Sequence, residues 1–498
     1  MSTRERGDTK VVMLNPSPRS GVQAHRRVEL PLSVLCPATP LDREGFDVTI
    51  VDQFADPAWE EKLERALDEK PICLGVTCMT GPQIVHALAA CRRAKERHPD
   101  LPIVWGGIHA SLLPQQTLAH PLIDVVVVGE GEATFSELVH ALRDGKPLDG
   151  VNGIHFERDG RHRSTPPRPF VDIDREPPLS YHLLDMDLYR RRLFGVDHIS
   201  FNSSRGCTFR CSFCWDPVMH RRTWRAMEPE TVLDHLSRIV RDHGIRGFLF
   251  TDDHFFIDMK RAQAILELLA RADLGITISK LQIRADTICR MSNDFLDLLV
   301  RARVKRLTVG VESGSQRVLD LIKKDVTVDE VIEANRKLAP YPIVPLYLFM
   351  MGLPTETPDE LRESLQLADR LVRENPEAAK TFNIYTPYPG TELYGLALQH
   401  GLREPDRLED WARFNFRNIP EESAWIPPAT KRLIEDLDFP LMFLGGNFVS
   451  PYRKTRSLVV VLGQLYAPIA RYRVRAMDVR FPIESRIVKR LGLFARQD

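Results

Sequence analysis

Short apolar segments alternate with amphipathic stretches of helical length along most of this chain. In the first 150 residues the apolar segments are residues 10–15, 46–52, 72–77, 102–107 and 124–129, and helical patterns cover 59–67, 83–98 and 132–143. Parallel strands need a long crossover connection, usually a helix, so this alternation favours a parallel sheet. We therefore predict an α/β fold that begins with a doubly wound parallel sheet, a Rossmann-like domain over residues 1–150.

A strand followed by a helix then recurs six times. The strand patterns are residues 198–204, 247–251, 280–284, 306–311, 344–351 and 380–385. A closed (β/α) barrel has eight such units. We predict a partial (β/α)6 TIM-like barrel, open on one side, over residues 193–400.

The remaining segments lack this alternation. Residues 151–192 include a proline-rich stretch, 164–182, and are predicted to be a semi-rigid linker between domains. Residues 401–498 are predicted to form a helical C-terminal domain. Its loop-rich beginning contains Trp411, Phe414, Phe416 and Trp425, which suit a small satellite core better than the lining of a substrate cavity.

Composition sets broad limits. A chain of 498 residues with zero formal charge favours several domains and no nucleic-acid partner. The polar, charged start is not expected to act as a signal peptide. The longest later apolar stretch, 457–470, is short and contains Gln464 and Pro468, so no integral membrane segment is expected. Eight cysteines are sparse for this length, which favours a reducing, cytoplasmic location.

Three of those cysteines form one closely spaced run, C-x3-C-x2-C, at Cys207, Cys211 and Cys214. Three thiolates can hold three corners of a 4Fe-4S cluster, which leaves the fourth iron open to a substrate or cofactor. A structural zinc site would normally need a fourth ligand and a second Cys or His pair, and no matching pair lies nearby. We predict a single cluster held by these three cysteines.

This run, with the aromatic Phe213 before its third cysteine, resembles the signature of the radical S-adenosylmethionine (SAM) enzymes. The resemblance implies that the open iron binds the amine and carboxylate of SAM, and that the reduced cluster cleaves SAM to a 5'-deoxyadenosyl radical. It also implies an external one-electron reductant of the flavodoxin or ferredoxin type.

The same resemblance assigns a set of SAM-binding residues at the carboxyl ends of the predicted barrel strands. Glu312 and Ser313 would contact the amine, ribose or carboxylate, and Lys324 would pair with the carboxylate. A zwitterionic headgroup requires one carboxylate and one cation, so the charges agree. For Asp252, Asp253 and Arg284, a structural ion pair is an equal alternative. The assigned set is Phe213, Thr251, Asp252, Arg284, Glu312, Ser313 and Lys324.

Glycines and small polar residues also follow strands of the first sheet, where ligands of parallel sheets bind. No G-x-G-x-x-G follows the first strand, which argues against a nicotinamide or flavin site. The segments 105–111 and 124–132 resemble the cobalamin-binding domain that precedes the radical domain in a large subfamily. The implied cobalamin residues are Asn15, Thr77, Met79, Thr80, Gly106, Gly107, His109, Gly129, Glu130 and Gly131.

Two alternatives stay open for these residues: the glycines could only form tight turns, and His109 could be a capping or loop histidine. D-x-H-x-x-G, whose histidine binds cobalt from below in the older cobalamin-binding pattern, is absent. We therefore expect cobalamin to bind with its tail base off the cobalt and with no histidine below.

Together these motifs predict a cobalamin-dependent radical SAM methyltransferase that acts on an unactivated carbon of a small molecule. The alternatives are an oxidative cyclase or ring-rearranging enzyme of the same architecture, and an RNA methylthiotransferase, which needs three further cluster cysteines. No individual catalytic residue and no substrate is assigned. The C-terminal arginines suit a solvated helical face, with a membrane-surface or anionic-substrate role as the alternative; they are Arg453, Arg456, Arg471, Arg473, Arg475, Arg480, Arg486 and Arg490.

Overall fold

The computed structural model describes residues 9–18, 29–414, 423–441 and 458–476. The chain divides into two compact units. Unit 1 comprises Met1–Arg191 and Glu404–Asn415, and unit 2 comprises Arg192–Arg403 and Phe416–Asp498. Unit 1 therefore includes a short segment that comes from far along the sequence.

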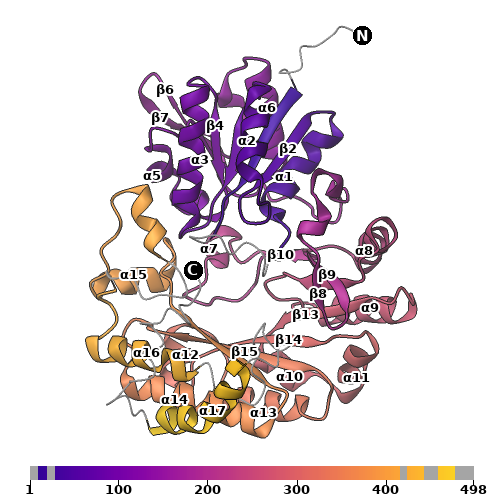
Figure 1. Cartoon of the computed structure of the whole chain (residues 1–498), viewed down its shortest axis with the longest axis vertical. Coiled ribbons are helices and arrows are strands. Elements are labelled where there is room, and N and C mark those ends of the chain that lie inside the picture. Colours follow the sequence, from indigo (N-terminus) through magenta and orange to yellow (C-terminus); the bar gives the residue numbers. More distant parts are fainter. Residues whose placement is uncertain (1–8, 19–28, 415–422, 442–457, 477–498) are drawn as a thin grey trace. The chain divides into compact units, whose positions relative to one another are not determined.

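Unit 1 is built on one seven-stranded sheet in the order β2-β1-β3-β4-β5-β6-β7 (Figure 1). The first five strands of that order pair in parallel. They are β1 (Lys10–Asn15), β2 (Asp47–Asp52), β3 (Leu74–Thr77), β4 (Ile103–Gly106) and β5 (Val125–Val127). These strands are almost wholly buried, as expected for a parallel sheet covered on both faces. The predicted doubly wound sheet is confirmed.

Helices connect these strands: α1 (Leu32–Arg43), α2 (Trp59–Asp68), α3 (Gln83–Arg97), α4 (Ile108–Leu112), α5 (Pro114–Leu118) and α6 (Glu132–Arg143). The sequence patterns predicted α2, α3 and α6. They did not predict α1, which contains Pro37 and Pro40. Its buried side chains, including Val34, Leu35 and Leu41, pack in the core, and this burial compensates for the lost backbone hydrogen bonds.

Two further strands extend the sheet beyond β5. They are β6 (Ile154–Arg158) and β7 (Arg161–Ser164), and they form an antiparallel hairpin that adds to the edge of β5. Ile154 and Phe156 are buried while β7 is exposed throughout. This hairpin lies within residues 151–192, which were predicted to be a linker, and its outer strand carries no apolar residue that would indicate a strand.

Unit 2 contains a second seven-stranded sheet in the order β16-β15-β14-β13-β12-β9-β8. Six of its strands pair in parallel, and each lies within a few residues of its predicted position. The six are β9 (Val196–Phe201), β12 (Gly247–Phe250), β13 (Thr277–Ile283), β14 (Arg306–Glu312), β15 (Val344–Met351) and β16 (Ala379–Ile384), with β8 (Arg191–Leu193) beside β9. The ends of the row do not pair, so the predicted open, partial barrel is confirmed.

Helices separate these strands along the chain (Figure 1). Several begin at a side chain that accepts a hydrogen bond from the first turn, such as Asp258, Ser292 and Thr327, which explains where they start. The helices are α8 (Pro229–His243), α9 (Met259–Arg271), α10 (Ala285–Arg290), α11 (Asn293–Arg301), α12 (Gln316–Leu321), α13 (Val328–Leu338), α14 (Pro358–Glu374) and α15 (Glu392–Gln399).

The C-terminal region is helical in its described parts, with α16 (Pro428–Leu441) and α17 (Leu458–Ala476). Trp425 is buried and donates a hydrogen bond to the Gly352 carbonyl, 3.0 Å away. This contact agrees with a core role, and Phe416 lies outside the described residues. Of the C-terminal arginines, Arg475 pairs with Asp369 on α14, at 2.9 Å. Arg453, Arg456, Arg480, Arg486 and Arg490 lie outside the described residues.

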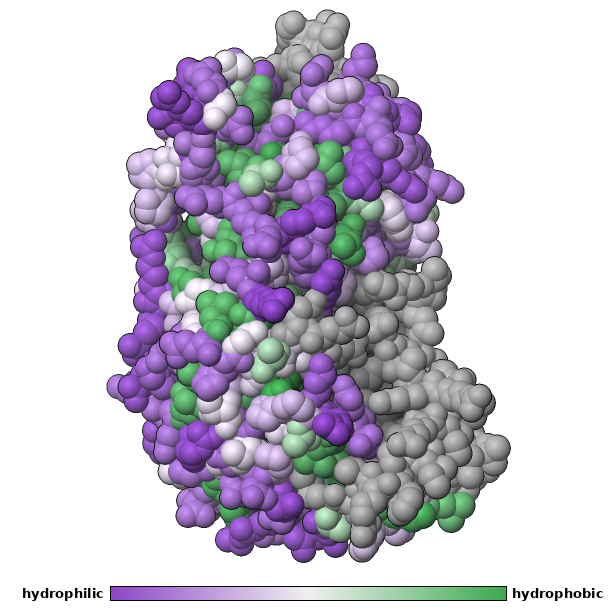
Figure 2. Space-filling model, turned by 90° about the vertical axis from the view of Figure 1, so that its left-hand side faces the viewer, coloured by the Kyte–Doolittle hydropathy of each residue, from purple (hydrophilic) through white to green (hydrophobic). Residues whose placement is uncertain are grey.

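The surface in Figure 2 is mainly hydrophilic, with apolar residues in small, separate groups. No helix in the described ranges is long and apolar enough to cross a membrane.

Glu356, which follows β15, provides a pH-dependent test of this fold. Its side chain is fully buried and accepts a hydrogen bond from the Gly352 amide at 2.7 Å. Burial raises the pKa of Glu356 from 4.5 to about 8. The folded state favours the protonated form of Glu356. The stabilisation from this protonated carboxyl is fully present below pH 4.5, the ordinary pKa, and is lost as the pH rises through about 8.

We therefore expect Glu356→Gln, which cannot ionise, to gain thermal stability relative to the wild type as the pH increases from 6 to 9. The gain should amount to about a few degrees in the unfolding midpoint. The exposed Glu363→Gln is the matched control, and its difference from the wild type should not change over this range. If the difference in unfolding midpoint between Glu356→Gln and the wild type did not change with pH, it would contradict the raised pKa of Glu356.

Candidate active site

The loop that carries Cys207, Cys211 and Cys214 is fixed by backbone contacts to two helices of unit 2. The Ser212 amide donates to the Ile322 carbonyl after α12, at 2.9 Å, and the Ser212 carbonyl accepts from the Leu393 amide of α15, also at 2.9 Å. The Cys214 amide closes a tight turn on the Cys211 carbonyl at 3.2 Å. A local turn and long-range backbone hydrogen bonds therefore position the loop.

None of the three thiols forms a disulfide, and each is partly accessible. Burial raises the pKa of Cys207 to about 11 and also raises those of Cys211 and Cys214. A bound metal reverses this preference, because a coordinating thiol is deprotonated. Among the described residues no three His, Cys, Asp or Glu side chains converge on a single ion. A cluster does not require such convergence, since each thiolate binds a different iron. The donor set fits a cluster.

Arg210 and Phe209, on the same loop, connect it to the segment between α12 and α13 and to the end of β13. Arg210 makes a bidentate pair with Asp325, at 2.8 and 2.9 Å. The guanidinium of Arg284, at the carboxyl end of β13, lies 3.9 Å from the centre of the Phe209 ring and also binds the Asp325 carbonyl at 2.8 Å. Arg284 further pairs with Asp286, at 3.0 Å. Arg284 therefore contacts protein groups around the cysteine loop.

Thr251 and Asp252, at the end of β12, also contact neighbouring backbone and side chains. Thr251 donates through its hydroxyl to the Phe201 carbonyl of β9 at 3.2 Å. Asp252 is buried and accepts hydrogen bonds from the hydroxyls of Ser203 and Ser204, just before the cysteine run. Asp252 thus supports the strand that enters the cysteine loop.

Glu312 and Lys324 form a second buried ion pair in this region. Nζ of Lys324 lies 2.7 Å from Oε1 of Glu312, and both side chains are about nine-tenths buried. Burial alone would lower the pKa of Lys324, but the Glu312 carboxylate more than offsets this effect and the pKa is raised. The same ammonium lies 5.9 Å from the centre of the Phe213 ring. The pair therefore lies beside the cysteine loop, and its contact with the headgroup of SAM remains a prediction.

The backbone around this pair is unusual. Glu312 has a φ of +70°, a left-handed conformation that costs energy for a residue with a side chain. The pairing of β14 with β15 shifts register between Gly310 and Glu312. A Cβ at Gly310 would overlap Oε1 of Glu312 and Nζ of Lys324. The bulge and Gly310 therefore make room for the ion pair at the end of β14.

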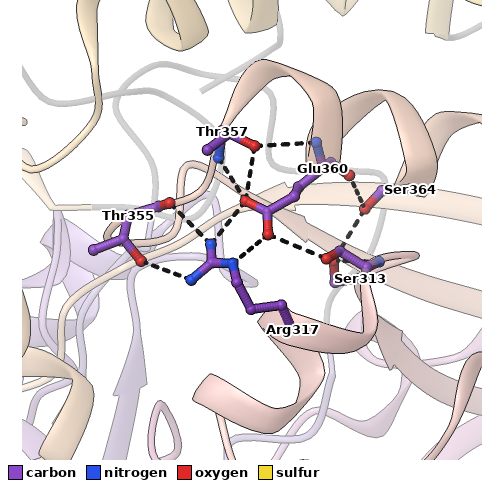
Figure 3. A network of polar contacts seen from close by, with 7 residues as sticks. Ser313, Arg317, Thr355, Thr357, Glu360 and Ser364 are labelled. Carbon is purple, nitrogen blue, oxygen red and sulfur yellow. Dashed lines mark hydrogen bonds and ion pairs between the residues drawn. The ribbon is translucent and has the colours of Figure 1, made fainter.

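Ser313 belongs to a polar network that braces the loop after β14 against the start of α14 (Figure 3). Its hydroxyl lies 3.1 Å from that of Ser364. In the same network Arg317 binds Glu360 at 2.7 Å and the Thr355 carbonyl at 3.0 Å. The Arg317 hydrogen bond lowers the pKa of Glu360 to about 2. Ser313 thus contacts α14, and its predicted contact with SAM remains a prediction.

Two buried residues near the cysteines were not among the predicted site residues. Asp216, two positions after Cys214, is buried, and this burial together with the Asp253 carboxylate raises its pKa to about 8. His254 is buried against Phe209, with ring centroids 5.4 Å apart, and burial lowers its pKa to about 3. Each adjoins a predicted segment, so proximity in sequence was the available signal.

In unit 1 the predicted cobalamin residues lie at the carboxyl ends of the parallel strands. Thr77 ends β3, Gly106 ends β4, and Gly107 follows with a φ of +88°. A Cβ at Gly107 would lie 2.8 Å from the backbone of Cys78 and from the Thr77 hydroxyl. Only glycine permits this close approach of the two strand ends. The ends of β3 and β4 therefore lie close together at the edge where parallel sheets bind ligands.

The other predicted residues surround this edge. Asn15 ends β1 and donates to Asp52 at the end of β2, at 3.0 Å, while Tyr189 donates to the same carboxylate at 3.0 Å. Met79 is 44 % exposed. The hydroxyl of Thr80 lies 2.9 Å from Nδ1 of His109.

The segment after β5 completes the predicted set. The Gly129 amide donates to the Ser111 hydroxyl at 3.0 Å. Glu130 accepts from the Val171 amide at 3.0 Å, and Gly131 caps the start of α6. The structure thus brings the predicted cobalamin residues to one end of the sheet. The close approach of β3 and β4 and the polar groups beside it fit a cobalamin site at this edge.

Two family models match this chain, in the order expected from its motifs. The B12 binding domain matches residues 26–139, and the Radical SAM superfamily matches residues 201–368. These ranges fall within unit 1 and unit 2, respectively.

Relatives and solved structures agree with this order. An uncharacterised methyltransferase of Pyrococcus horikoshii is 31 % identical over 400 residues, 79 % of this chain and 84 % of the relative. The anaerobic magnesium-protoporphyrin IX monomethyl ester cyclase of Rubrivivax gelatinosus is 30 % identical over 82 % of this chain and 72 % of its own length. The cobalamin-dependent SAM radical enzyme OxsB has a similar fold, with a TM-score of 0.71 at 18 % identity over 98 % of this chain and 75 % of OxsB. The chain belongs to the cobalamin-dependent radical SAM enzymes, a family whose cofactors are a 4Fe-4S cluster, SAM and cobalamin.

Proposed function

We propose that this cobalamin-dependent radical SAM enzyme is a methyltransferase that acts on an unactivated carbon of a small molecule. The observation that carries the proposal is the match to the Pyrococcus horikoshii methyltransferase, which spans 79 % of this chain and 84 % of that protein. The match therefore includes both the B12-binding and the radical SAM regions, so the same pair of domains is present in a protein named as a methyltransferase.

The residues around the cysteine loop suit the handling of SAM. Cys207, Cys211 and Cys214 would hold three irons and leave one iron open. Glu312 would meet the ammonium of SAM and Lys324 its carboxylate, because the two charges already lie 2.7 Å apart in a buried setting. When bound, the cluster and SAM supply a carbon-centred radical, and cobalamin carries the methyl group.

Residues at the edge of the unit 1 sheet would hold cobalamin. Gly107 lets the ends of β3 and β4 approach closely, and Thr77, Thr80 and His109 place polar atoms beside that point. An external one-electron reductant of the flavodoxin or ferredoxin type would supply the electrons.

Cyclisation is the second candidate, because the Rubrivivax gelatinosus cyclase has nearly the same identity as the methyltransferase relative. The RNA methylthiotransferase alternative is less favoured. It needs three further cluster cysteines in the leading domain, whereas Cys73, Cys78 and Cys91 are fully buried in the core of unit 1. Burial raises the pKa of Cys73 and of Cys91 to about 12, as expected for core thiols.

A product assay separates methyl transfer from cyclisation. The full chain, with its cluster reconstituted and with cobalamin loaded and reduced, is mixed with SAM before any substrate is present. A methyltransferase is expected to form S-adenosylhomocysteine in an amount equal to the loaded cobalamin. With substrate present, 5'-deoxyadenosine should accumulate together with S-adenosylhomocysteine.

Chromatography of both products is the measurement. The matched control is protein that carries the cluster but no cobalamin, which should form no S-adenosylhomocysteine. Formation of 5'-deoxyadenosine alone by the cobalamin-loaded protein would overturn the methyltransferase proposal and favour cyclisation or rearrangement.

A further inference from the structure

The segment Glu404–Asn415, here called the return segment, belongs to unit 1 although it follows the whole barrel in sequence. Its helical turn, η5 (Leu408–Arg413), places Leu408 and Trp411 in buried positions. Gln116 on α5 fixes it twice: Oε1 accepts from Nε1 of Trp411 at 2.6 Å, and Nε2 donates to the Pro405 carbonyl at 2.7 Å. The return segment is therefore an integral part of unit 1.

Trp411 packs against His109, the histidine next to the close approach of β3 and β4. The two ring centroids are 5.6 Å apart in an edge-to-face arrangement. Nδ1 of His109 lies 2.9 Å from the Thr80 hydroxyl. The imidazole is thus held on one side by the loop after β3 and on the other by the return segment.

The second ring nitrogen of His109 has no such partner. Its side chain is fully buried, and Nε2 makes no hydrogen bond to any residue that the structure describes. Burial lowers the pKa of His109 to about 4, so the ring is neutral at physiological pH. An unsatisfied buried polar atom costs about 1 to 3 kcal/mol, and native proteins rarely leave one without a reason. A ligand that reaches this nitrogen would remove that cost.

The position of His109 restricts which part of a ligand can reach it. The residue follows Gly107 at the carboxyl edge of the sheet, where ligands of parallel sheets bind. The fully buried position of His109 suits a narrow group better than a wide, flat group such as the corrin ring. The nucleotide tail of cobalamin is narrow and carries phosphate oxygens, ribose hydroxyls and a benzimidazole nitrogen. These groups can accept from or donate to Nε2, whichever tautomer the Thr80 contact selects.

We propose that His109 binds the nucleotide tail of cobalamin through Nε2, and that the return segment, through Trp411 and Gln116, positions this imidazole. The proposal rests on the binding of cobalamin by this chain, which the proposed function also requires. It makes a segment that follows the barrel part of the cobalamin site.

The test compares cobalamin with cobinamide, which has the corrin ring but lacks the nucleotide tail. Binding of hydroxocobalamin and of diaquocobinamide to the full chain is titrated by absorbance, without reference to activity. His109→Ala is expected to weaken cobalamin binding at least about tenfold and to leave cobinamide binding unchanged. Trp411→Ala should reproduce part of that loss, and Trp411→Phe should restore most of it.

His98→Ala is the matched control. Nε2 of His98 is also buried without a partner in the described residues, but His98 lies at the C-terminal end of α3, and this variant should bind both ligands like the wild type. Gln116→Leu provides a second route, because it releases the return segment without altering His109.

The outcomes are distinguishable. An equal loss for cobalamin and cobinamide, or no loss for either, would overturn the role of His109 toward the tail. Full cobalamin binding by Gln116→Leu and by Trp411→Ala would overturn the role of the return segment. If the wild-type chain bound no cobalamin, that result would instead contradict the proposed function.

Discussion

Alanine at Cys207, Cys211 and Cys214 together is expected to leave a chain that folds but holds no 4Fe-4S cluster. The wild type should carry about four irons and four sulfides per chain after anaerobic reconstitution, and the triple variant close to none. We expect this loss because the three cysteines have the spacing of cluster ligands. The structure agrees, since backbone hydrogen bonds of Ser212 connect the loop to α12 and α15, and none of the three thiols forms a disulfide. Iron and sulfide analysis is the measurement.

A single Cys211→Ala variant sharpens this prediction. Formation of 5'-deoxyadenosine should fall to background, because the cluster is the electron source for the cleavage of SAM. S-adenosylhomocysteine formed through loaded, reduced cobalamin can persist. Cys289→Ala, which removes a partly accessible thiol outside the loop, is the matched control and should keep its cluster. A triple variant that retains a full cluster would show that the ligands lie elsewhere.

The parallel strands of both sheets could be predicted from the sequence because each is a short, largely apolar run between turn residues. β15, for example, has the same bounds as the predicted strand, Val344–Met351. Periodicity failed for α1, where Pro37 and Pro40 suggest a loop, and for the hairpin of β6 and β7, whose outer strand is fully exposed. In both segments tertiary packing overrides the local pattern.

At the site, sequence motifs identify individual residues, whereas the contacts between these residues depend on the fold. The family resemblance named Glu312 and Lys324 as separate SAM contacts, but their ion pair across α12 was not predicted. The contacts of Asp252 with Ser203 and Ser204 depend on the adjacency of β9 and β12, which the strand pattern does not give by itself. The contact of Trp411 with His109 joins residues about 300 positions apart, and no periodicity indicates it.

Unit 1 therefore differs from the domain that the sequence boundaries suggest. A fragment that ends at residue 150 lacks the hairpin of β6 and β7, Tyr189 and the return segment. Tyr189 donates to Asp52 at the carboxyl edge of the sheet, and Gln116 on α5 has both its hydrogen bonds in the return segment. The domain boundaries from sequence remain a prediction, and cobalamin binding is best measured on the full chain.

The ion pair of Glu312 and Lys324 gives the second large expected effect. Lys324→Met is expected to destabilise unit 2 by about 3 to 5 kcal/mol, because it leaves a buried carboxylate without its partner. The double variant Glu312→Gln with Lys324→Met should recover most of that stability, since no unpaired charge remains. Thermal unfolding of the two singles and the double measures this recovery. The exposed pair of Lys323 and Glu392 is the matched control, and its loss should cost about 1 kcal/mol or less.

Binding of SAM to the cluster-loaded protein then separates a structural pair from a ligand-binding pair. If Glu312 meets the ammonium and Lys324 the carboxylate, both singles and the double variant should bind SAM about tenfold to a hundredfold more weakly, because each charge-assisted bond is worth about 1.5 to 3 kcal/mol. Stability would return in the double variant while SAM affinity would not. A purely structural pair predicts that both return together. Recovery of SAM binding in the double variant would therefore remove these two residues from the SAM site and leave them as a brace for the bulge at the end of β14.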